Sequence, residues 1–261
     1  MTDPTPLDTA HAAMQSTRGD AARRLRFFER LADSELFLLL ETEAQGDSIN
    51  PEVFEVDGAK YILAFDREER LAEFAKGVAY HATMSGRVAA RMLAGQGVGL
   101  ALNLGVAPSS ILIPSDAMAW LGEILDETPE EIRARPVAFS APAGIPETLL
   151  SALDSKLAIA AGLAKTAYLV AVTYKGGNSA HMLAIIDALP KAEGALAKAV
   201  SEAVSFSGFE TPLDVAFFAG DDPLCSTLQK AGLRFDLPER TLATDNPAAP
   251  GRDPEKPPIL R

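Results

Sequence analysis

The sequence is poor in the residues that build redox, metal and membrane sites. Its 261 residues include one cysteine and three histidines, and no segment reaches the roughly 20 apolar residues that span a bilayer. One cysteine cannot form a disulfide within the chain, and His11, His81 and His181 lack the paired spacing of a metal site. We therefore expect no metal and no cofactor. The first residues are polar and lack the apolar core of a signal peptide, so we expect a cytoplasmic protein.

Positive charge is also scarce, and it is unevenly distributed. Lys and Arg number 24 against 36 Asp and Glu, a net charge of -12 that repels phosphate backbones and anionic lipid. We therefore expect neither nucleic acid nor a membrane as partner. Residues 1–135 hold 13 basic and 22 acidic side chains (net -9), and residues 136–240 hold 8 and 11 (net -3). This asymmetry predicts two joined units.

The remaining composition is that of a folded, two-domain protein. Hydrophobic residues make up 48% and charged residues 23%, and 261 residues suit two domains of ordinary size. Pro136, Pro142, Gly144 and Pro146 punctuate the middle of the chain and mark a boundary. We predict domains over residues 15–135 and 146–240, followed by a proline-rich, disordered or loosely docked tail over residues 241–261.

Hydrophobic spacing and turn residues predict mixed helices and strands in the first unit. Asp57-Gly58 indicates a tight hairpin turn. Asp66 and Glu69 are spaced as a capping pair, and Ser85 and Ser115 are expected helix caps. The predicted helices cover residues 20–33, 66–76, 85–94 and a segment after Ser115, and the strands cover 36–40, 53–56, 61–65, 98–102 and 110–113.

The second unit shows the same mixture. Helices are predicted at 146–163, 191–204 and 222–231, and strands at 167–174, 181–187, 214–218 and 233–235. We therefore predict an α/β fold with α+β character, formed by two mixed domains in tandem.

Motifs for nucleotide binding and nucleophilic catalysis are missing. Gly95, Gly97 and Gly99 follow a helix and open a strand, whereas a dinucleotide loop follows a strand and opens a helix. Lys175-Gly176-Gly177 lies between strands and is explained as a turn. No G-x-S-x-G occurs. Asp66, Glu68 and Glu69 could act as acid and base, but helix capping explains the first and last of them.

Cys225 is a candidate reactive thiol with two opposing influences. Asp222 as cap and Pro223 in the first turn place it near a helix N-terminus, which stabilises a thiolate. The carboxylates of Asp221 and Asp222 oppose ionisation. We favour a small buried thiol over a reactive one.

Two further groups are candidate binding residues. Arg23, Arg26 and Arg30 share a helix face, where they pair with Asp20, Glu29 and Asp33 or form a docking strip for an acidic partner. The loop after the strand at 98–102 offers a speculative ligand site, although turn formation also explains its Asn and Gly. Its candidate ligand-binding residues are Asn103, Gly105, Ser109 and Ser110.

The ordered features resemble the SseB family, the enhanced-serine-sensitivity proteins. The resemblance runs from about Asp20 to Leu237, and the family often has Asn-Pro-Gly where this chain has Asn103-Leu104-Gly105. The segments that carry it are Arg26-Phe27-Phe28, Leu31 to Leu40, Tyr61 to Phe65, Asp66 to Leu71 and Gly99 to Gly105 in the first unit, with Tyr168 to Val172, Met182 to Asp187 and Leu213 to Phe217 in the second.

The resemblance implies a soluble bacterial protein of two α/β domains with no established activity or cofactor. The family name refers to a growth phenotype linked to serine metabolism and sulfurtransferase genes, which suggests a partner among metabolic enzymes. Our leading hypothesis is a non-enzymatic protein that acts through protein contacts. The alternatives are a small-molecule binder or enzyme with a pocket at the Asn103 to Ser110 loop or between the domains, and self-association through the helix of Met118 and Trp120.

Overall fold

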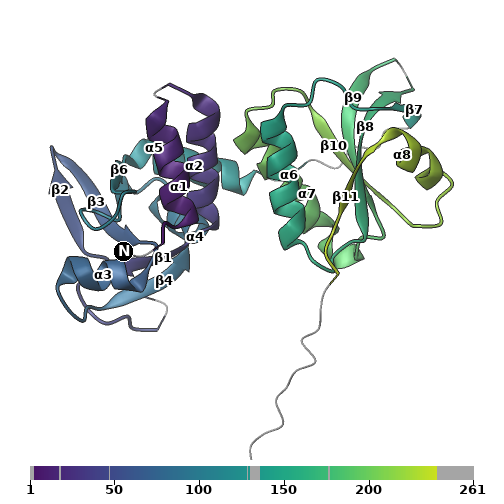
Figure 1. Cartoon of the computed structure of the whole chain (residues 1–261). Helices are drawn as coiled ribbons and strands as arrows, with labels where there is room; N and C mark the ends of the chain where they lie inside the picture. Colours follow the sequence, from purple (N-terminus) through teal and green to yellow (C-terminus); the bar gives the residue numbers. More distant parts are fainter. Residues whose placement is uncertain are drawn as a thin grey trace, which may run out of the picture.

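The chain forms two mixed sheets, each with helices on both faces (Figure 1), which confirms the predicted α/β class. This computed structural model describes residues 3–17, 19–46, 48–127, 129, 136–175 and 177–239. The predicted tail, residues 241–261, lies outside the described residues. Within the described part, no helix is both long and apolar enough to cross a membrane.

The first unit is a six-stranded sheet with strand order β4-β1-β3-β5-β6, and β2 pairs with β3. β3 and β5 are parallel, and the other pairs are antiparallel. Its elements are α1 (Pro6–Ser16), α2 (Ala21–Asp33), β1 (Glu35–Leu39), β2 (Val53–Val56), β3 (Ala59–Phe65), α3 (Glu68–Ala75), β4 (His81–Ser85), α4 (Gly86–Leu93), β5 (Val98–Leu102), β6 (Ile111–Ile113) and α5 (Ser115–Asp126).

Alternation along the central strands gives this sheet two apolar faces. Leu36 and Leu38 of β1 belong to the core beneath α1, α2, α4 and α5, whereas Leu39 belongs to the smaller core beneath α3. This explains the unbroken apolar run at 36–40, because a strand covered on both faces needs apolar residues at every position. Figure 1 shows α3 on the opposite side of the sheet from the other helices.

The second unit is a five-stranded sheet in which β9 and β10 are parallel. β8 pairs with β9 along one of its edges. Along its other edge, the first half of β8 pairs with β11 and the second half pairs with β7. The elements are β7 (Pro136–Ser140), α6 (Glu147–Ile159), β8 (Thr166–Tyr174), β9 (Ser179–Ile186), a 3-10 turn η1 (Pro190–Ala192), α7 (Glu193–Ser207), β10 (Leu213–Phe218), α8 (Cys225–Ala231) and β11 (Leu233–Asp236). The core beneath α6 and α7 is the larger of its two cores.

Several local predictions are confirmed. Asp57 and Gly58 have positive φ and join β2 to β3 as a hairpin. The side chain of Ser85 accepts a hydrogen bond from the backbone of Val88 and caps α4. Gly95 and Gly97 lie between α4 and β5, and Gly99 lies in β5, so the three glycines follow a helix and open a strand as predicted.

Other local predictions are wrong. α3 begins at Glu68 without a side-chain cap, because the carboxylate of Asp66 is bound elsewhere. Ser115 is the first residue of α5 rather than its cap. α8 begins at Cys225 instead of Asp222, whose carboxylate accepts from the backbone of Leu224 at 2.8 Å.

Two elements lie outside the domain bounds that we predicted. α1 begins at Pro6, before residue 15, and contributes Leu7 and Ala10 to the first core. β7 precedes residue 146 and pairs with β8 in the second sheet. The proline-rich composition around β7 made this segment resemble a linker. Proline is tolerated in β7 because an edge strand has one side on which no N–H is needed for pairing.

Candidate functional site

The predicted ligand loop lies over a buried polar network. Asn103 follows β5 with a φ of 50° and is fully buried. Its Oδ1 accepts a hydrogen bond from the backbone N of Asp66 at 3.1 Å, and its Nδ2 donates to Oγ of Ser109 at 2.8 Å. Ser109 is fully buried too. The amide of Asn103 therefore joins the end of β3 to its own loop.

The network continues into α1 and α3. Oγ of Ser109 donates to Oδ1 of Asp8 at 2.5 Å, and Nη2 of Arg70 donates to Oδ2 of Asp8 at 2.5 Å. Nη1 of Arg70 also donates to Asp66 at 2.7 Å, and the Thr5 hydroxyl donates to Asp66 at 2.6 Å. We call Thr5, Asp8, Asp66, Arg70, Asn103 and Ser109 the Asp8 network.

Hydrogen bonding keeps this network ionised despite its burial. Burial alone would raise the pKa of Asp8, but hydrogen bonds from Arg70, Ser109 and the Thr5 backbone outweigh it and hold the pKa well below its usual range. Burial likewise opposes the charge of Arg70, while Asp8 and Asp66 raise its pKa. The pair is thus a charged bridge that fastens α1 to α3.

These contacts give the loop residues a structural role in the fold. The polar atoms of Asn103 and Ser109 already bond to protein groups, and the Gly105 backbone donates to Oγ of Ser110 at 3.1 Å. A ligand at this loop would have to replace bonds that hold α1 in place. Ligand binding by Asn103, Gly105, Ser109 and Ser110 stays a prediction.

The predicted arginine strip lies where α2 meets the second unit. Arg23 pairs with Asp20 at 3.1 Å and donates to the Ser16 hydroxyl at 2.8 Å. Arg26 pairs with Glu29, as predicted, and also donates to Ser155 of α6 at 3.4 Å. Arg30 is half-buried on the same helix.

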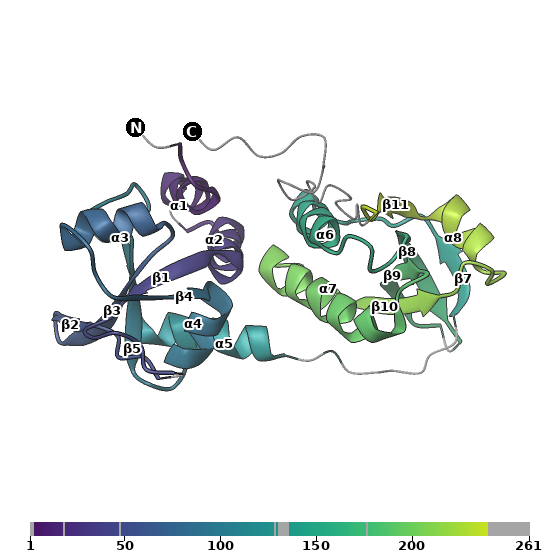
Figure 2. The ribbon, with the colours of Figure 1, turned by 90° about the horizontal axis from the view of Figure 1, so that it is seen from below.

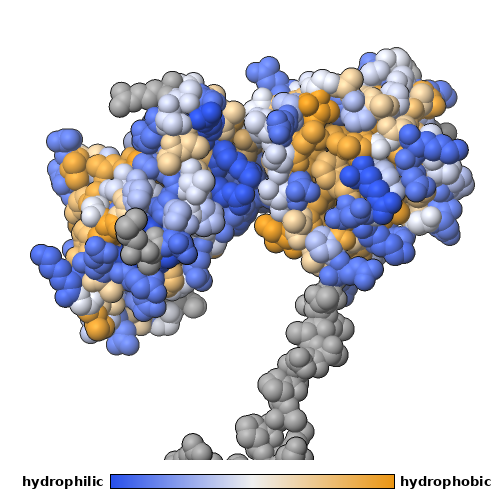
Figure 3. Space-filling model, viewed as in Figure 1, coloured by the Kyte–Doolittle hydropathy of each residue, from blue (hydrophilic) through white to orange (hydrophobic). Residues whose placement is uncertain are grey.

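A groove of 370 Å³ runs between α2 on one side and α6 and α7 on the other. Its floor includes Ala152 and Phe206, and the hydroxyls of Thr148 and Ser151 lie along it. The full lining is Asp20, Ala22, Arg23, Arg26, Glu29, Glu147, Thr148, Ser151, Ala152, Phe206 and Ser207. In Figure 3, the side of α2 that faces the second unit is hydrophilic. Two of the three predicted docking arginines thus line a hollow between the units.

A cluster of opposite charges lies at the same junction. Arg87 of α4 donates to both carboxylate oxygens of Glu202 in α7, and Lys156 of α6 lies 2.8 Å from Asp33 of α2. Lys156 also lies 3.5 Å from Glu202 and 3.9 Å from Glu29. We call Glu29, Asp33, Arg87, Lys156 and Glu202 the interdomain clasp. The hydrogen bond and charge of Glu202 raise the pKa of Arg87 against the opposing effect of burial.

An apolar contact fixes the units together beside this clasp. Phe206 is a residue of α7, yet its side chain belongs to the core of the first unit. Trp120 of α5 packs between Phe28 and Phe206, with ring centroids 5.2 and 6.5 Å away. Figure 2 shows α7 beside α2. Met118 is fully buried, so the helix predicted to mediate self-association is occupied within the chain.

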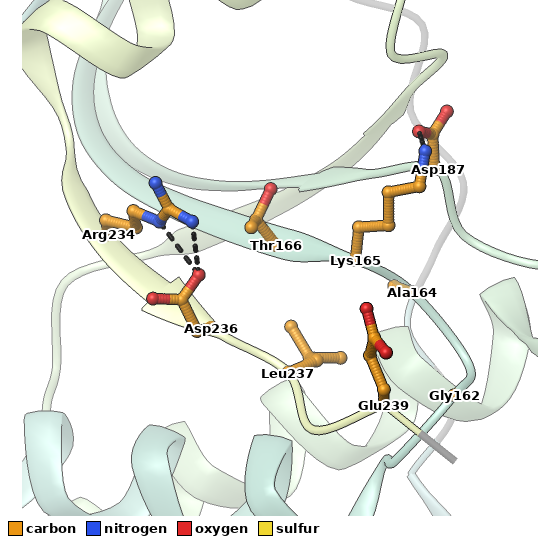
Figure 4. A pocket seen from close by; sticks show the side chains of 9 residues that line it. All are labelled: Gly162, Ala164, Lys165, Thr166, Asp187, Arg234, Asp236, Leu237 and Glu239. Atoms are coloured by element: carbon orange, nitrogen blue, oxygen red, sulfur yellow. Dashed lines mark hydrogen bonds and ion pairs between the residues drawn. The ribbon is translucent and has the colours of Figure 1, made fainter. Parts of the chain in front are cut away.

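A second hollow, of 410 Å³, lies where β8 and β11 meet the end of β9 (Figure 4). Lys165 pairs with Asp187 at 2.6 Å, and Arg234 pairs with Asp236 at 2.6 Å. Figure 4 shows Thr166 between these pairs. The hydrogen bond from Lys165, with that from the Gly220 backbone, lowers the pKa of Asp187. Because both pairs are largely exposed, solvent screens them strongly.

The remaining candidates are isolated. Cys225 is half-buried, and its Sγ donates to the carbonyl of Ala219 at 3.2 Å. Burial, followed by the charges of Asp222, Asp187 and Asp221, raises the pKa of its thiol, as the neighbouring carboxylates predicted. Within the described residues, no cluster of His, Cys, Asp and Glu could hold a metal ion. Gly176 of the predicted 175–177 turn lies outside the described residues.

Sequence reasoning missed the residues that do most at these sites. Asp8 and Arg70 are 62 positions apart, and Arg87 and Glu202 are 115 positions apart. No local spacing rule connects residues at such separations. The one available signal was the position of Arg70 four residues after Asp66, a spacing that favours an ion pair on a helix.

Comparison with known proteins supports the resemblance found in the sequence. Residues 7–120 match the family model described as the SseB protein N-terminal domain, a match that runs from α1 into α5. Comparisons with curated proteins and with solved structures give no match. The assignment of the second unit as an SseB-type C-terminal domain stays a prediction. Over residues 7–120, this chain therefore carries an SseB protein N-terminal domain.

Proposed function

We propose that this protein is a non-enzymatic binding module, and that the groove between α2 and α6/α7 receives an acidic segment of a partner protein. The observation that carries the proposal is the position of Arg23 and Arg26 on the lining of this groove. An apolar floor with polar groups around it is the usual anatomy of a protein interface. Arginine is also enriched at such interfaces.

Both guanidinium groups are accessible to a partner. The side chains of Arg23 and Arg26 are 44% and 34% exposed. Each guanidinium has five N–H donors, so a group that binds one carboxylate within the chain can still bind a second. Asp20 and Glu29 therefore orient the arginines, and the partner supplies a further carboxylate. Hydroxyls at Thr148 and Ser151 offer additional hydrogen bonds.

The family resemblance suggests where such a partner is to be sought. We place the interaction in the cytoplasm, with a metabolic enzyme connected to serine or sulfur metabolism as the partner class. Cell fractionation tests the compartment, and affinity purification tests the partner.

A groove-filling variant tests the proposed surface without changing its charge. Ser151→Trp places an indole in the groove, whereas Ala158→Trp places one on an exposed turn of the same helix. We expect partner recovery to fall only with Ser151→Trp. Equal recovery by both variants would rule out the groove.

A small-molecule ligand in the same groove is the second candidate. Its volume of 370 Å³ lies within the range of about 300–1,000 Å³ that is typical of ligand pockets. A thermal-shift screen of amino acids, keto acids and sulfur metabolites tests this candidate. A shift that disappears in Ser151→Trp but persists in Ala158→Trp would support it, and a flat response would exclude these compounds.

A further inference from the structure

β4 is the end strand of the first sheet, and one of its edges has no strand beside it in the described residues. Figure 1 shows β4 at the lower edge of this sheet. An end strand exposes a row of backbone N–H and C=O groups that can pair with another strand.

The register with β1 identifies the outward backbone groups. The carbonyl of Tyr80 accepts from Leu40 at 2.9 Å, and the N–H of Gly86 donates to Ser34 at 2.8 Å. Because bonding direction alternates along a strand, Ala82 and Met84 also face β1, and His81 and Thr83 direct their backbone groups away from it. The side chain of Thr83 is exposed, whereas that of His81 packs on Phe37 with ring centroids 5.7 Å apart.

β4 differs from the other edge strands because nothing in its sequence protects it. Natural proteins protect sheet edges with charges, proline, bulges or short strands. β4 reads His-Ala-Thr-Met-Ser, without charge or proline, and pairs with β1 in regular register. Among the other described edges, β2 carries Glu55, β6 has three residues followed by Pro114, β7 begins with Pro136, β10 carries Asp214, and β11 carries Arg234 and Asp236.

We infer that β4 pairs antiparallel with β4 of a second copy of this chain, around a two-fold axis beside Thr83. This arrangement places Thr83 opposite Thr83, and His81 opposite Ser85 of the second copy. The pairing forms about four backbone hydrogen bonds. Each Thr83 N–H donates to Thr83 of the other copy, and each Ser85 N–H donates to His81 of the other copy. The Ser85 carbonyl adds no bond between the copies, because it belongs to the start of α4. Two six-stranded sheets then become continuous across the axis.

Exposed apolar residues flank β4 in the sequence. Val78 and Tyr80 precede the strand with 107% and 55% exposure, and Val88 follows it with 48% exposure. Val88 lies in the first turn of α4, so the register of β4 does not extend to it. Val78 and Tyr80 leave apolar surface beside the free edge, which a second copy would cover.

The short strand predicts a weak dimer. β4 has five residues, and a stable interface usually needs about 1,200–2,000 Å² of buried surface. We expect the mean molecular mass in equilibrium sedimentation to rise from monomer toward dimer between about 10 µM and about 1 mM, the concentration range of weak association.

Variants at Thr83 test the pairing. Thr83→Pro removes an N–H that faces away from β1, so the sheet of the monomer keeps its bonds while the dimer loses two at its axis. We expect it to weaken association at least about tenfold. Thr83→Lys places like charges opposite each other and should weaken association in a chain whose backbone is unchanged. Thr83→Val keeps the N–H and should dimerise like the wild type, and circular dichroism establishes that each variant is folded.

Amide exchange tests the register independently. The amides of Thr83 and Ser85 should become more protected as protein concentration rises, whereas those of Ala82 and Met84 should not change. A monomer throughout the concentration range, or a dimer unaffected by both Thr83→Pro and Thr83→Lys, would overturn the inference. It would also be overturned if Thr83 gained protection only when a foreign extended peptide was added.

Discussion

Arg87 and Glu202 form a two-point ion pair that joins the two units of the chain. Nη1 and Nη2 of Arg87 donate to the two carboxylate oxygens of Glu202 at 2.6 and 3.0 Å, and Arg87 also reaches Asp33 at 3.0 Å. The Glu202 side chain is 6% exposed, so solvent screens the pair weakly. The relative position of the units therefore depends on charged contacts as well as on Phe206.

A double-mutant cycle measures this coupling. We expect Arg87→Gln and Glu202→Gln each to destabilise the protein, and the double variant to cost less than the sum of both. A coupling free energy of about 1–3 kcal/mol from urea unfolding is expected for residues in one network. Arg91→Gln with Asp126→Gln, at an exposed pair, is the matched cycle and should give about 0–1 kcal/mol. Equal coupling in both cycles would contradict a structural role for the clasp.

The Asp8 network predicts loss of stability in acid. The pKa of Asp8 is depressed in the folded chain, so its contribution is complete above the ordinary value of 3.8 and is lost as the pH falls below it. Asp8→Asn should cost about 3–5 kcal/mol at pH 7, because it leaves Arg70 buried with one partner fewer. The variant's free energy of unfolding should also change less than that of the wild type between about pH 4 and 2. Asp57→Asn, in an exposed turn, is the control and should leave the free energy of unfolding at pH 7 close to that of the wild type in urea unfolding.

Gly86 is required by the close approach of α4 to α2. A Cβ at this position would lie 1.8 Å from the carbonyl oxygen of Leu31, which is backbone and cannot rotate away. Gly86→Ala should lower the free energy of unfolding by about 1–3 kcal/mol or more. Gly194→Ala in α7 meets no atom within 4 Å and should raise it by about 0.5–1 kcal/mol. Thermal unfolding of the two variants checks the difference, and a neutral Gly86→Ala would show that the helices can separate.

Cys225 should react slowly with alkylating reagents at neutral pH. Burial and nearby carboxylates raise its pKa, which lowers the thiolate fraction at pH 7. Asp221→Asn removes one of these charges and should increase the rate of iodoacetamide modification by less than about tenfold. Asp154→Asn on α6 should leave the rate unchanged. Fast modification of the wild type would revive the reactive-thiol hypothesis.

Local patterns predicted the fold class well because helices and strands depend on nearby residues. The unbroken apolar run of β1, the turn at Asp57-Gly58 and the cap at Ser85 each need only a few positions to act. The cap prediction at Asp66 was wrong because other side chains compete for its carboxylate. Asp66 has the spacing of a cap, but Arg70 and Thr5 bind its carboxylate instead.

The candidate sites were harder to predict because they depend on how distant segments pack. The sequence indicates an arginine strip on α2 but cannot show that α6 and α7 lie opposite Arg23 and Arg26. Similarly, Asn103 is recognisable as a turn residue, whereas its bond to Ser109, and through it to Asp8, requires α1 to fold onto the same loop. Phe206 reads as an apolar position of α7, and only the fold shows that it packs in the other unit's core.

The most direct test of the central claim is quantitative affinity purification with variants of equal net charge. Arg23→Gln combined with Arg26→Gln removes two positive charges from the groove, and Arg24→Glu makes the same change of net charge at an exposed position of the same helix. We predict that the double variant recovers at least about tenfold less partner than the wild type, and that Arg24→Glu recovers a normal amount. Equal recovery by the double variant and the wild type would contradict the groove as the binding surface.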